Sequence, residues 1–310
     1  MNIKKTNILV VGTGAIGSYY GGRLAQLIPQ TATLCRSDYE SVKENGIEVK
    51  SCKGDFHFTP LQVLKSASEY KLNPDFILVC LKVLPMIDPI KIIKDAVKPN
   101  TAIVLIQNGI NIEQKMKEAF PSNEIISGIA FICVNRIAFG KVHHLDYGRL
   151  ELGSYPDGVS NKTNILADFF NQTNVECKVS ENIVRQRWQK LLWNVPFNSL
   201  SVIGGQIDTK EIMASESTIH LIRKIMNEIL IVAEITGNKL DNGLIEKMID
   251  STKNMKPYKT SMLLDYQAKR SLEIDAILGN VIKTAKLHNI THPYIESLYS
   301  LLKLLAENNK

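Results

Sequence analysis

The segment from Asn7 to Ala25 constrains the fold more than any other part of the chain. Four consecutive apolar residues lead into three glycines spaced as GxGxxG, and apolar residues then recur at intervals of three and four. A short apolar run predicts a buried parallel strand, and the three-and-four spacing predicts an amphipathic helix. We therefore expect a strand, a glycine turn and a helix in direct succession. The turn consists of Gly12, Thr13, Gly14, Ala15, Ile16 and Gly17.

Each glycine of this turn has its own expected task. Gly12 allows the chain to turn tightly, Gly14 lets the backbone approach a pyrophosphate, and Gly17 lets the helix pack closely on the strand. The free N–H groups and positive dipole end of the helix would then face the pyrophosphate. A GxGxxG alone is a weak signal, but one placed between a strand and a helix indicates a dinucleotide-binding domain.

The residue after the second expected strand predicts which dinucleotide is bound. Residues 31–35 form a short strand pattern, and Arg36 follows. An acid about 20 residues past the glycines binds the ribose of NAD, whereas a nearby arginine accommodates the 2′-phosphate of NADP. Asp38 and Glu40 compete for this role, but they lie past the strand end, where acids favour the first turn of a helix. We expect NADP(H), with Arg36 at the 2′-phosphate.

Two further strand ends carry polar residues. Residues 76–81 and 102–106 are continuous apolar runs, typical of central parallel strands. Lys82 follows the first run, and Asn108 follows the second as part of an Asn-Gly pair. Because ligands bind beyond the carboxyl ends of parallel strands, both side chains are site candidates. The alternatives are a solvated lysine and ordinary turn chemistry.

Strand and helix patterns alternate up to about residue 180, and only helical patterns follow. This change predicts an α/β fold, with a Rossmann-type dinucleotide-binding domain over residues 1–180 and an all-helical domain over residues 181–310. In the first domain we also expect a helix over 85–97, strands over 125–133 and 142–152 with a turn at 146–148, a helix over 161–171 and a strand over 175–179. In the second we expect helices over 188–200, 218–235, 244–255, 261–278 and 294–306.

The first of these later helices carries a polar stripe. Lys190, Asn194 and Asn198 are four residues apart and therefore share one helix face. The residues around them are apolar and include Trp193, so the helix looks buried on most sides. Unpaired buried polar groups are costly, which favours a ligand site over a solvent-facing stripe.

The segment from 258 to 275 holds two weaker candidates. Ser261 fits the N-cap of a helix. Glu273 taken alone is best interpreted as a surface charge. His288 and His292 have the spacing of metal ligands, but no third ligand is evident. We interpret them as part of a turn between helices and expect no metal site.

Composition excludes several classes of protein. The net charge of +6 is not gathered in a basic block, so it favours anionic ligands but not a nucleic-acid partner. No apolar run approaches the ~18 residues of a membrane helix, and no secretory leader is evident. The five cysteines are scattered without a CxxC pair, which predicts buried free thiols. We expect a cytoplasmic protein that binds no membrane.

Taken together, these pieces resemble the ketopantoate reductase (2-dehydropantoate 2-reductase) family. They occur in the family's order across nearly the whole chain, and those of the helical half are far more specific than the glycine turn. They are GTGAIGSYYGGRLA, CR at 35–36, LVCLK ending at Lys82, QNG ending at Gly109, WQKLLWNVPFNSLS and SMLLD…EID. The resemblance implies an NADPH-binding Rossmann domain joined to a helical domain similar to that of 6-phosphogluconate dehydrogenases.

The resemblance also implies roles for individual residues. Lys190 would be the proton donor, and Glu273 a catalytic or nicotinamide-side partner. Asp208 stands where some members carry one more polar substrate contact, and that role stays open. Cofactor contacts would come from the glycine turn, Arg36, Lys82, Asn108, Glu273 and the backbone of Val134. Substrate contacts would come from Asn108, Lys190, Asn194, Asn198 and Ser261.

Simple chemistry agrees with these roles. Hydride addition to a ketone leaves an alkoxide, which a lysine in a dry cleft can protonate and stabilise. Burial lowers a lysine pKa and a nearby carboxylate raises it, so a Lys190–Glu273 pair can bring the donor near working pH.

The expected function is NADPH-dependent reduction of ketopantoate to pantoate, a step of pantothenate synthesis. One alternative is a paralogue that reduces another 2-oxo acid, because fold and cofactor do not fix the substrate. Another is a redox sensor that binds NADP(H) without turnover, although a sensor needs neither Lys190 nor Glu273. A small 2-oxo acid is the expected partner, and a homodimer is a possible assembly.

Overall fold

The computed structural model describes residues 2–309, and their contacts divide into two units. The first, called here the sheet unit, contains the residues up to 82 together with 86–107 and 112–183. The second, the helical unit, contains the residues from 184 onward and two short loops, 83–85 and 108–111. Both loops follow strands of the sheet unit in the sequence, yet they make their contacts with the helices.

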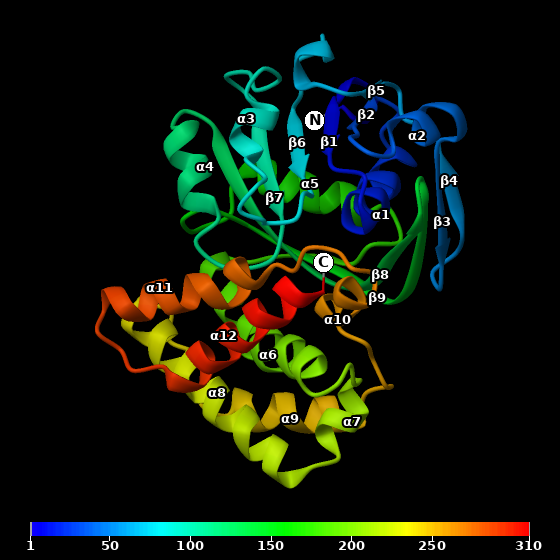
Figure 1. Cartoon of the computed structure of the whole chain (residues 1–310). Coiled ribbons are helices and arrows are strands. Elements are labelled where there is room, and N and C mark those ends of the chain that lie inside the picture. Colours follow the sequence, from blue (N-terminus) through cyan, green and yellow to red (C-terminus); the bar gives the residue numbers. More distant parts are fainter. Residues whose placement is uncertain (1, 310) are drawn as a thin grey trace. The chain divides into compact units, whose positions relative to one another are not determined.

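One sheet of ten strands forms the centre of the sheet unit (Figure 1). The strands are β1 (Ile8–Val11), β2 (Thr31–Leu34), β3 (Ile47–Ser51), β4 (Phe56–Phe58), β5 (Val63–Leu64), β6 (Phe76–Val79), β7 (Ala102–Ile106), β8 (Glu124–Ala138), β9 (Lys141–Ser154) and β10 (Cys177–Val179). Their order is β4-β3-β9-β8-β7-β6-β1-β2-β5, and β10 pairs with β9. The central strands β2, β1, β6, β7 and β8 are parallel, so their carboxyl ends share one edge.

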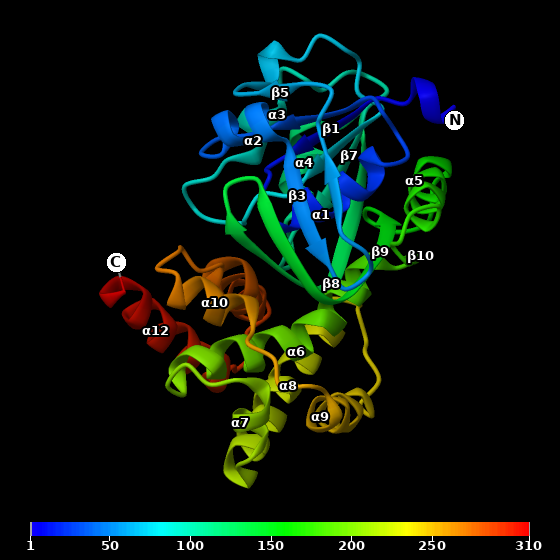
Figure 2. The same ribbon diagram turned by 90° about the vertical axis from the view of Figure 1, so that its right-hand side faces the viewer.

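Helices cover both faces of this sheet (Figures 1 and 2). They are α1 (Ala15–Ala25), α2 (Tyr39–Asn45), α3 (Pro89–Ile93), α4 (Glu113–Ala119) and α5 (Asn161–Asn171), with short 3₁₀ turns at Ile3–Lys5 and Ala67–Glu69. Val10 of β1 lies in one apolar cluster with Tyr20 of α1 and Phe170 of α5. The next residue, Val11, lies in a second cluster with Met116 of α4. Burial on both faces explains why the central strands are continuous apolar runs.

Two expectations for this unit are wrong. β9 runs without a break from Lys141 to Ser154, so residues 146–148 do not separate two strands. Gly148 is instead an unpaired bulge residue with φ of +99°, at a register shift between β8 and β9. The helix expected over 85–97 is only α3, which begins where Asp88 accepts hydrogen bonds from the N–H groups of Ile90 and Lys91.

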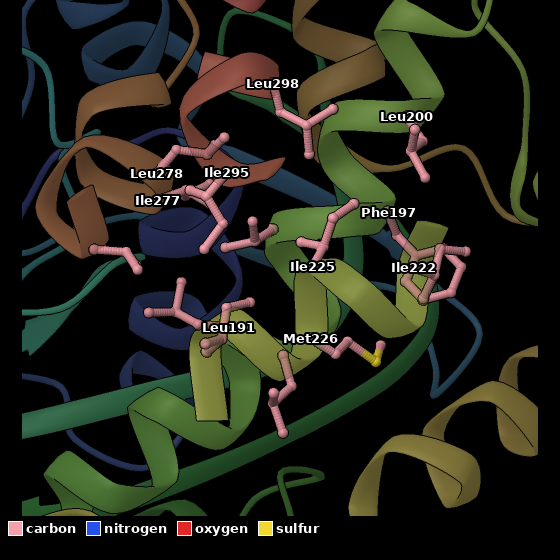
Figure 3. Packing of buried hydrophobic residues seen from close by; sticks show 14 of the residues in the cluster. Leu191, Phe197, Leu200, Ile222, Ile225, Met226, Ile277, Leu278, Ile295 and Leu298 are labelled. Atoms are coloured by element: carbon pink, nitrogen blue, oxygen red, sulfur yellow. The ribbon is translucent and has the colours of Figure 1, made fainter. Parts of the chain in front are cut away.

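The helical unit is built around α6. Its elements are α6 (Ile183–Ile203), α7 (Thr209–Met213), α8 (Glu216–Ile235), α9 (Leu244–Asn254), α10 (Ser261–Gln267), a π-helical turn (Asp275–Gly279), α11 (Asn280–Leu287) and α12 (Pro293–Asn308). Figure 3 shows the core, where Leu191 and Phe197 of α6 meet Ile222 of α8 and Ile295 of α12. Each such buried side chain contributes roughly 1.5–3 kcal/mol. The buried polar residues of α6, such as Asn198, therefore stand among apolar side chains.

The single helix expected over 261–278 is broken. α10 ends at Gln267, and the chain is irregular up to the π-helical turn, with Lys269 at φ +52°. The N-cap of α10 is Thr260, whose hydroxyl accepts a hydrogen bond from the N–H of Leu263, and not Ser261. Glu273 consequently stands just before the π-helical turn and not on a helix that begins at Ser261.

The predicted fold class is confirmed: a Rossmann-type α/β part is followed by an all-helical part. His288 and His292 lie between α11 and α12, as expected, and residues 2–309 contain no cluster of three metal-ligating side chains. Four cysteines are buried as expected, but Cys52 is exposed in the turn between β3 and β4. Within the same residues, no helix is both long and apolar enough to span a membrane.

Candidate active site

The glycine turn has the geometry that a dinucleotide needs. Gly12 adopts φ of +94°, which only glycine accepts readily. A Cβ on Gly17 would lie 1.9 Å from the carbonyl oxygen of Gly12, so nothing larger fits between α1 and the turn. A Cβ on Gly14 would meet no atom within 4 Å, and Gly14 caps the N-terminus of α1. The open space beside Gly14 and the free N–H groups of α1 fit a pyrophosphate.

The environment of the residues after β2 favours Arg36 as a contact of the 2′-phosphate over Asp38 or Glu40 as a contact of the ribose. Arg36 is exposed, while Asp38 is 3% exposed. The hydroxyl of Thr13 donates a hydrogen bond of 2.6 Å to the Asp38 carboxylate, so this acid is engaged by the glycine turn itself. Asp38 and Glu40 stand at the start of α2, as the sequence indicated.

Two other candidates lie in the sheet unit. Lys82 is half-buried and follows β6 by three residues. Val134 is half-buried on β8, at a shift in its register with β9. Gly12 and Lys82 therefore follow the parallel neighbours β1 and β6 at the same sheet edge.

The helical unit brings together three of the predicted residues. The Nζ of Lys190 on α6 donates to the Oδ1 of Asn108 at 3.0 Å. The Nδ2 of the same Asn108 donates to the Oε2 of Glu273 at 3.0 Å. The other oxygen of Glu273 accepts the backbone N–H of Val83 at 2.9 Å. Because an ammonium only donates and a carboxylate only accepts, the orientation of the Asn108 amide is fixed by its two neighbours.

The electrostatics of this cluster suit a proton donor. The pKa of Lys190 falls from its ordinary 10.5 to about 8, mainly because the side chain is buried. The positive charge of Arg187 lowers the pKa as well, and the carboxylate of Glu273 raises it. The lysine is thus protonated at neutral pH but gives up its proton far more readily than a solvated lysine does.

The polar stripe of α6 points to a ligand. Asn194 is 8% exposed and Asn198 is 2% exposed, yet within residues 2–309 neither side-chain amide forms a hydrogen bond. Neither amide is among the side-chain atoms that are both fully buried and without a hydrogen-bond partner, so each reaches solvent-accessible space where a polar molecule can bind. Ser261 is exposed at the first residue of α10. Asp208 serves α7 instead, because its carboxylate caps the N–H groups of Lys210 and Glu211.

Sequence reasoning missed the loop that carries Asn108. Gly109 has φ of +96°, and its carbonyl accepts a hydrogen bond of 3.1 Å from Arg187. Asn280 donates to the carbonyl of Ile110 at 2.8 Å, and Asn111 donates to the hydroxyl of Thr284 at 3.1 Å. The only available signal was the position of Arg187, three residues before Lys190 and therefore on the same helix face.

Comparison with known proteins identifies the family. The model described as "Ketopantoate reductase PanE/ApbA" matches residues 8–157, and the model of its C-terminal domain matches residues 182–306. The chain belongs to the ketopantoate reductase family. It is therefore an oxidoreductase, of a family that uses NAD(P)H and small 2-oxo acids.

Individual ketopantoate reductases are similar along their whole length. The 2-dehydropantoate 2-reductase of Nostoc sp. is 35% identical over 100% of this chain and 98% of its own. The solved enzyme from Methylococcus capsulatus is 45% identical, with a TM-score of 0.91 and 98% of each chain covered. That from Geobacter metallireducens is 34% identical, with a TM-score of 0.90 and 96% of this chain and 99% of its own covered.

Proposed function

We propose that this chain catalyses the NADPH-dependent reduction of 2-dehydropantoate to pantoate, a step in pantothenate biosynthesis, with Lys190 as the proton donor. The observation that carries the proposal is the hydrogen-bonded series from Lys190 through Asn108 to Glu273. It joins a half-buried lysine of lowered pKa to a carboxylate through an amide of fixed orientation.

This series matches the chemistry of ketone reduction. When hydride reaches the carbonyl carbon, negative charge develops on the carbonyl oxygen, and the ammonium of Lys190 stabilises that charge and then transfers its proton. Asn108 holds the Nζ in place, and Glu273 keeps the amide turned so that Oδ1 faces the lysine. Glu273 is in turn fixed by the N–H of Val83, which makes the donor preorganised rather than mobile.

The residues that would hold the dinucleotide lie mainly in the sheet unit. The glycine turn would receive the pyrophosphate, Arg36 the 2′-phosphate, and Lys82, Val134, Asn108 and Glu273 further parts of the molecule. The reduced nicotinamide, when bound, supplies the hydride. The exposed Arg36 beside an Asp38 already engaged by Thr13 supports NADPH over NADH.

The residues that would hold the substrate lie in the helical unit. Within residues 2–309 the side-chain amides of Asn194 and Asn198 form no hydrogen bond, and each can both donate and accept. Together with Lys190, Asn108 and Ser261, they offer more polar groups than a bare 2-oxo acid needs. This surplus favours a substrate with an additional hydroxyl, such as 2-dehydropantoate.

Another 2-oxo acid is the second candidate. A D-mandelate dehydrogenase solved with NADH and anilino(oxo)acetate has a TM-score of 0.89 at 22% identity, so the fold accommodates other acids. The assembly is also open to test: a Staphylococcus aureus ketopantoate reductase, 21% identical, is described as dimeric. We propose a homodimer, which light scattering of the purified chain checks.

The substrate assignment is tested by the ratio of kcat/KM for 2-dehydropantoate to that for 2-oxoisovalerate, which lacks the hydroxymethyl group. A site that hydrogen-bonds a substrate hydroxyl rejects the analogue without it by large factors, because its own polar groups are left unpaired. We expect a high ratio in the wild type and a smaller one in Asn194→Ala and Asn198→Ala, with NADPH binding unchanged. A wild-type ratio near one would contradict 2-dehydropantoate as the substrate, and another 2-oxo acid would then be the better candidate.

A further inference from the structure

We propose that Arg187 is a positioning residue of this site: it fixes the loop that carries Asn108, and its charge sets the pH range over which Lys190 can donate a proton. The inference rests on the proposed function, because it concerns the proton donor of that reaction. It starts from an arrangement that needs an explanation, namely two basic side chains, one buried and one half-buried, on the same face of α6.

Burying Arg187 beside Lys190 is unfavourable on electrostatic grounds. Arg187 is 3% exposed, and the two residues are three apart on α6, so their charges face the same side. Like charges in a dry environment repel more strongly than on a surface. An arginine at such a position calls for a role that offsets this cost, and the hydrogen bond from its guanidinium to the carbonyl of Gly109 indicates that role.

The first task of Arg187 is mechanical. Its guanidinium donates to the carbonyl of Gly109, the residue directly after Asn108. Gly109 is confined on its other side, because a Cβ there would lie 2.5 Å from the carbonyl oxygen of Ala276. The turn is therefore held between α6 and the π-helical turn. This confinement places the Asn108 amide between Lys190 and Glu273.

The second task is electrostatic. Among the described residues, the charged groups that shift the pKa of Lys190 are Arg187 on its own helix and Glu273 on the facing segment, while the loop contributes the neutral Asn108. Glu273 favours the protonated lysine and Arg187 disfavours it. Without Arg187, the lysine would hold its proton up to a higher pH and would be a weaker acid at neutral pH.

The experiment compares Arg187→Gln and Arg187→Lys with Arg185→Gln as the matched control. Arg185 lies on the same helix, and its Nε also donates to a backbone carbonyl, that of Lys239 at 2.8 Å, but it does not act on the pKa of Lys190. The readouts are the pH profile of kcat/KM and the labelling of Lys190 by trace acetic anhydride as a function of pH, quantified by mass spectrometry. The labelling reports the protonation of Lys190 without any turnover.

In Arg187→Gln we expect both profiles to move to higher pH by roughly 0.5–1 unit, because a like charge has been removed. We also expect kcat to fall roughly tenfold, because Asn108 is less well placed. Arg187→Lys keeps the charge, so its pH profiles should stay near those of the wild type even if kcat falls. Arg185→Gln should match the wild type in both readouts.

A labelling profile of folded Arg187→Gln that coincides with the wild type would overturn the proposal. So would a shift of the labelling profile of Arg187→Lys to higher pH by roughly 0.5 unit or more, because this variant keeps the charge. That outcome requires only the Lys variant to fold. Failure of the proposed function looks different, because the wild type would then reduce no 2-dehydropantoate while its labelling profile could still respond to Arg187.

Discussion

The two units prepare for their ligands by different physical means. In the sheet unit, the glycine turn depends on backbone conformation and on missing side chains: a positive φ at Gly12, a close approach at Gly17 and open space at Gly14. In the helical unit, the candidate site depends on charge: Lys190 and Glu273 are joined through one amide. Binding at the glycine turn should therefore depend on the shape of the backbone, whereas activity in the helical unit should depend on the protonation of Lys190.

This difference predicts how each region responds to change. A backbone site should be sensitive to an added methyl group and insensitive to pH. A site made of charges should tolerate changes of shape better but should lose its activity when one proton is lost. The lowered pKa of Lys190 places that loss of activity near pH 8. The glycines of the turn have no titratable side chain, so binding at the turn should not change at this pH.

The largest expected effect is that of removing the donor. Lys190→Met should lower kcat by about 10²–10⁴, the usual range for general acid–base help, while NADPH affinity changes little. In the wild type, kcat/KM should fall as pH rises through about 8, because the lysine must be protonated to act. This fall should be absent from the residual activity of Lys190→Met, which stopped-flow measurements of NADPH oxidation can follow.

The matched control is Lys247→Met, which removes an exposed lysine from α9 of the same unit. It should leave both the rate and the pH profile unchanged. If Lys190→Met kept the wild-type rate, the proton donor would be another group. The proposed dependence of the helical unit on the protonation of Lys190 would then be wrong.

The contrast also explains what the sequence could predict. The strand, glycine turn and first helix follow local rules, so the roles of Gly12 and Gly17 could be anticipated from spacing alone. The stripe with Lys190 and Asn194 was equally local, because helical periodicity puts residues four apart on one face. The turn expected at Asp146 was wrong because pairing with β8 absorbs Gly148 as a bulge.

The partners of Glu273 could not be predicted from spacing. They include Val83 and Asn108, which are 190 and 165 residues away in the sequence. Because most glutamates lie on the surface, the sequence alone favoured a surface position for Glu273, and only the family resemblance indicated a role. Arg187 went unassigned for the same reason, since its acceptor at Gly109 is 78 residues away.

A smaller effect is expected from adding one methyl group to the glycine turn. In Gly17→Ala the new Cβ would clash with the carbonyl of Gly12, so the free energy of unfolding should fall by about 1–3 kcal/mol or more. Gly14→Ala meets no neighbour, so its stability should stay within about 1 kcal/mol of the wild type. The same methyl group would fill the space proposed for the pyrophosphate, so Gly14→Ala should lose NADPH affinity. Urea unfolding measures the change in stability, and fluorescence titration measures the change in NADPH affinity. An unchanged affinity in Gly14→Ala would place the pyrophosphate elsewhere.

The smallest effect concerns Arg36, the charged side chain that the proposal places at the 2′-phosphate. A charge-assisted contact with a phosphate is worth about 1–2 kcal/mol at an exposed position, or roughly 5- to 30-fold in affinity. Arg36→Ala should therefore raise the Kd for NADPH by that factor and leave the Kd for NADH unchanged, because only NADPH carries the 2′-phosphate. Lys43→Ala, which removes an exposed positive charge from the neighbouring α2, is the control for a general loss of electrostatic attraction. If Arg36→Ala weakened both dinucleotides equally, or if Lys43→Ala matched it, Arg36 would not be the contact of the 2′-phosphate, and the selectivity between NADPH and NADH would come from another part of the site.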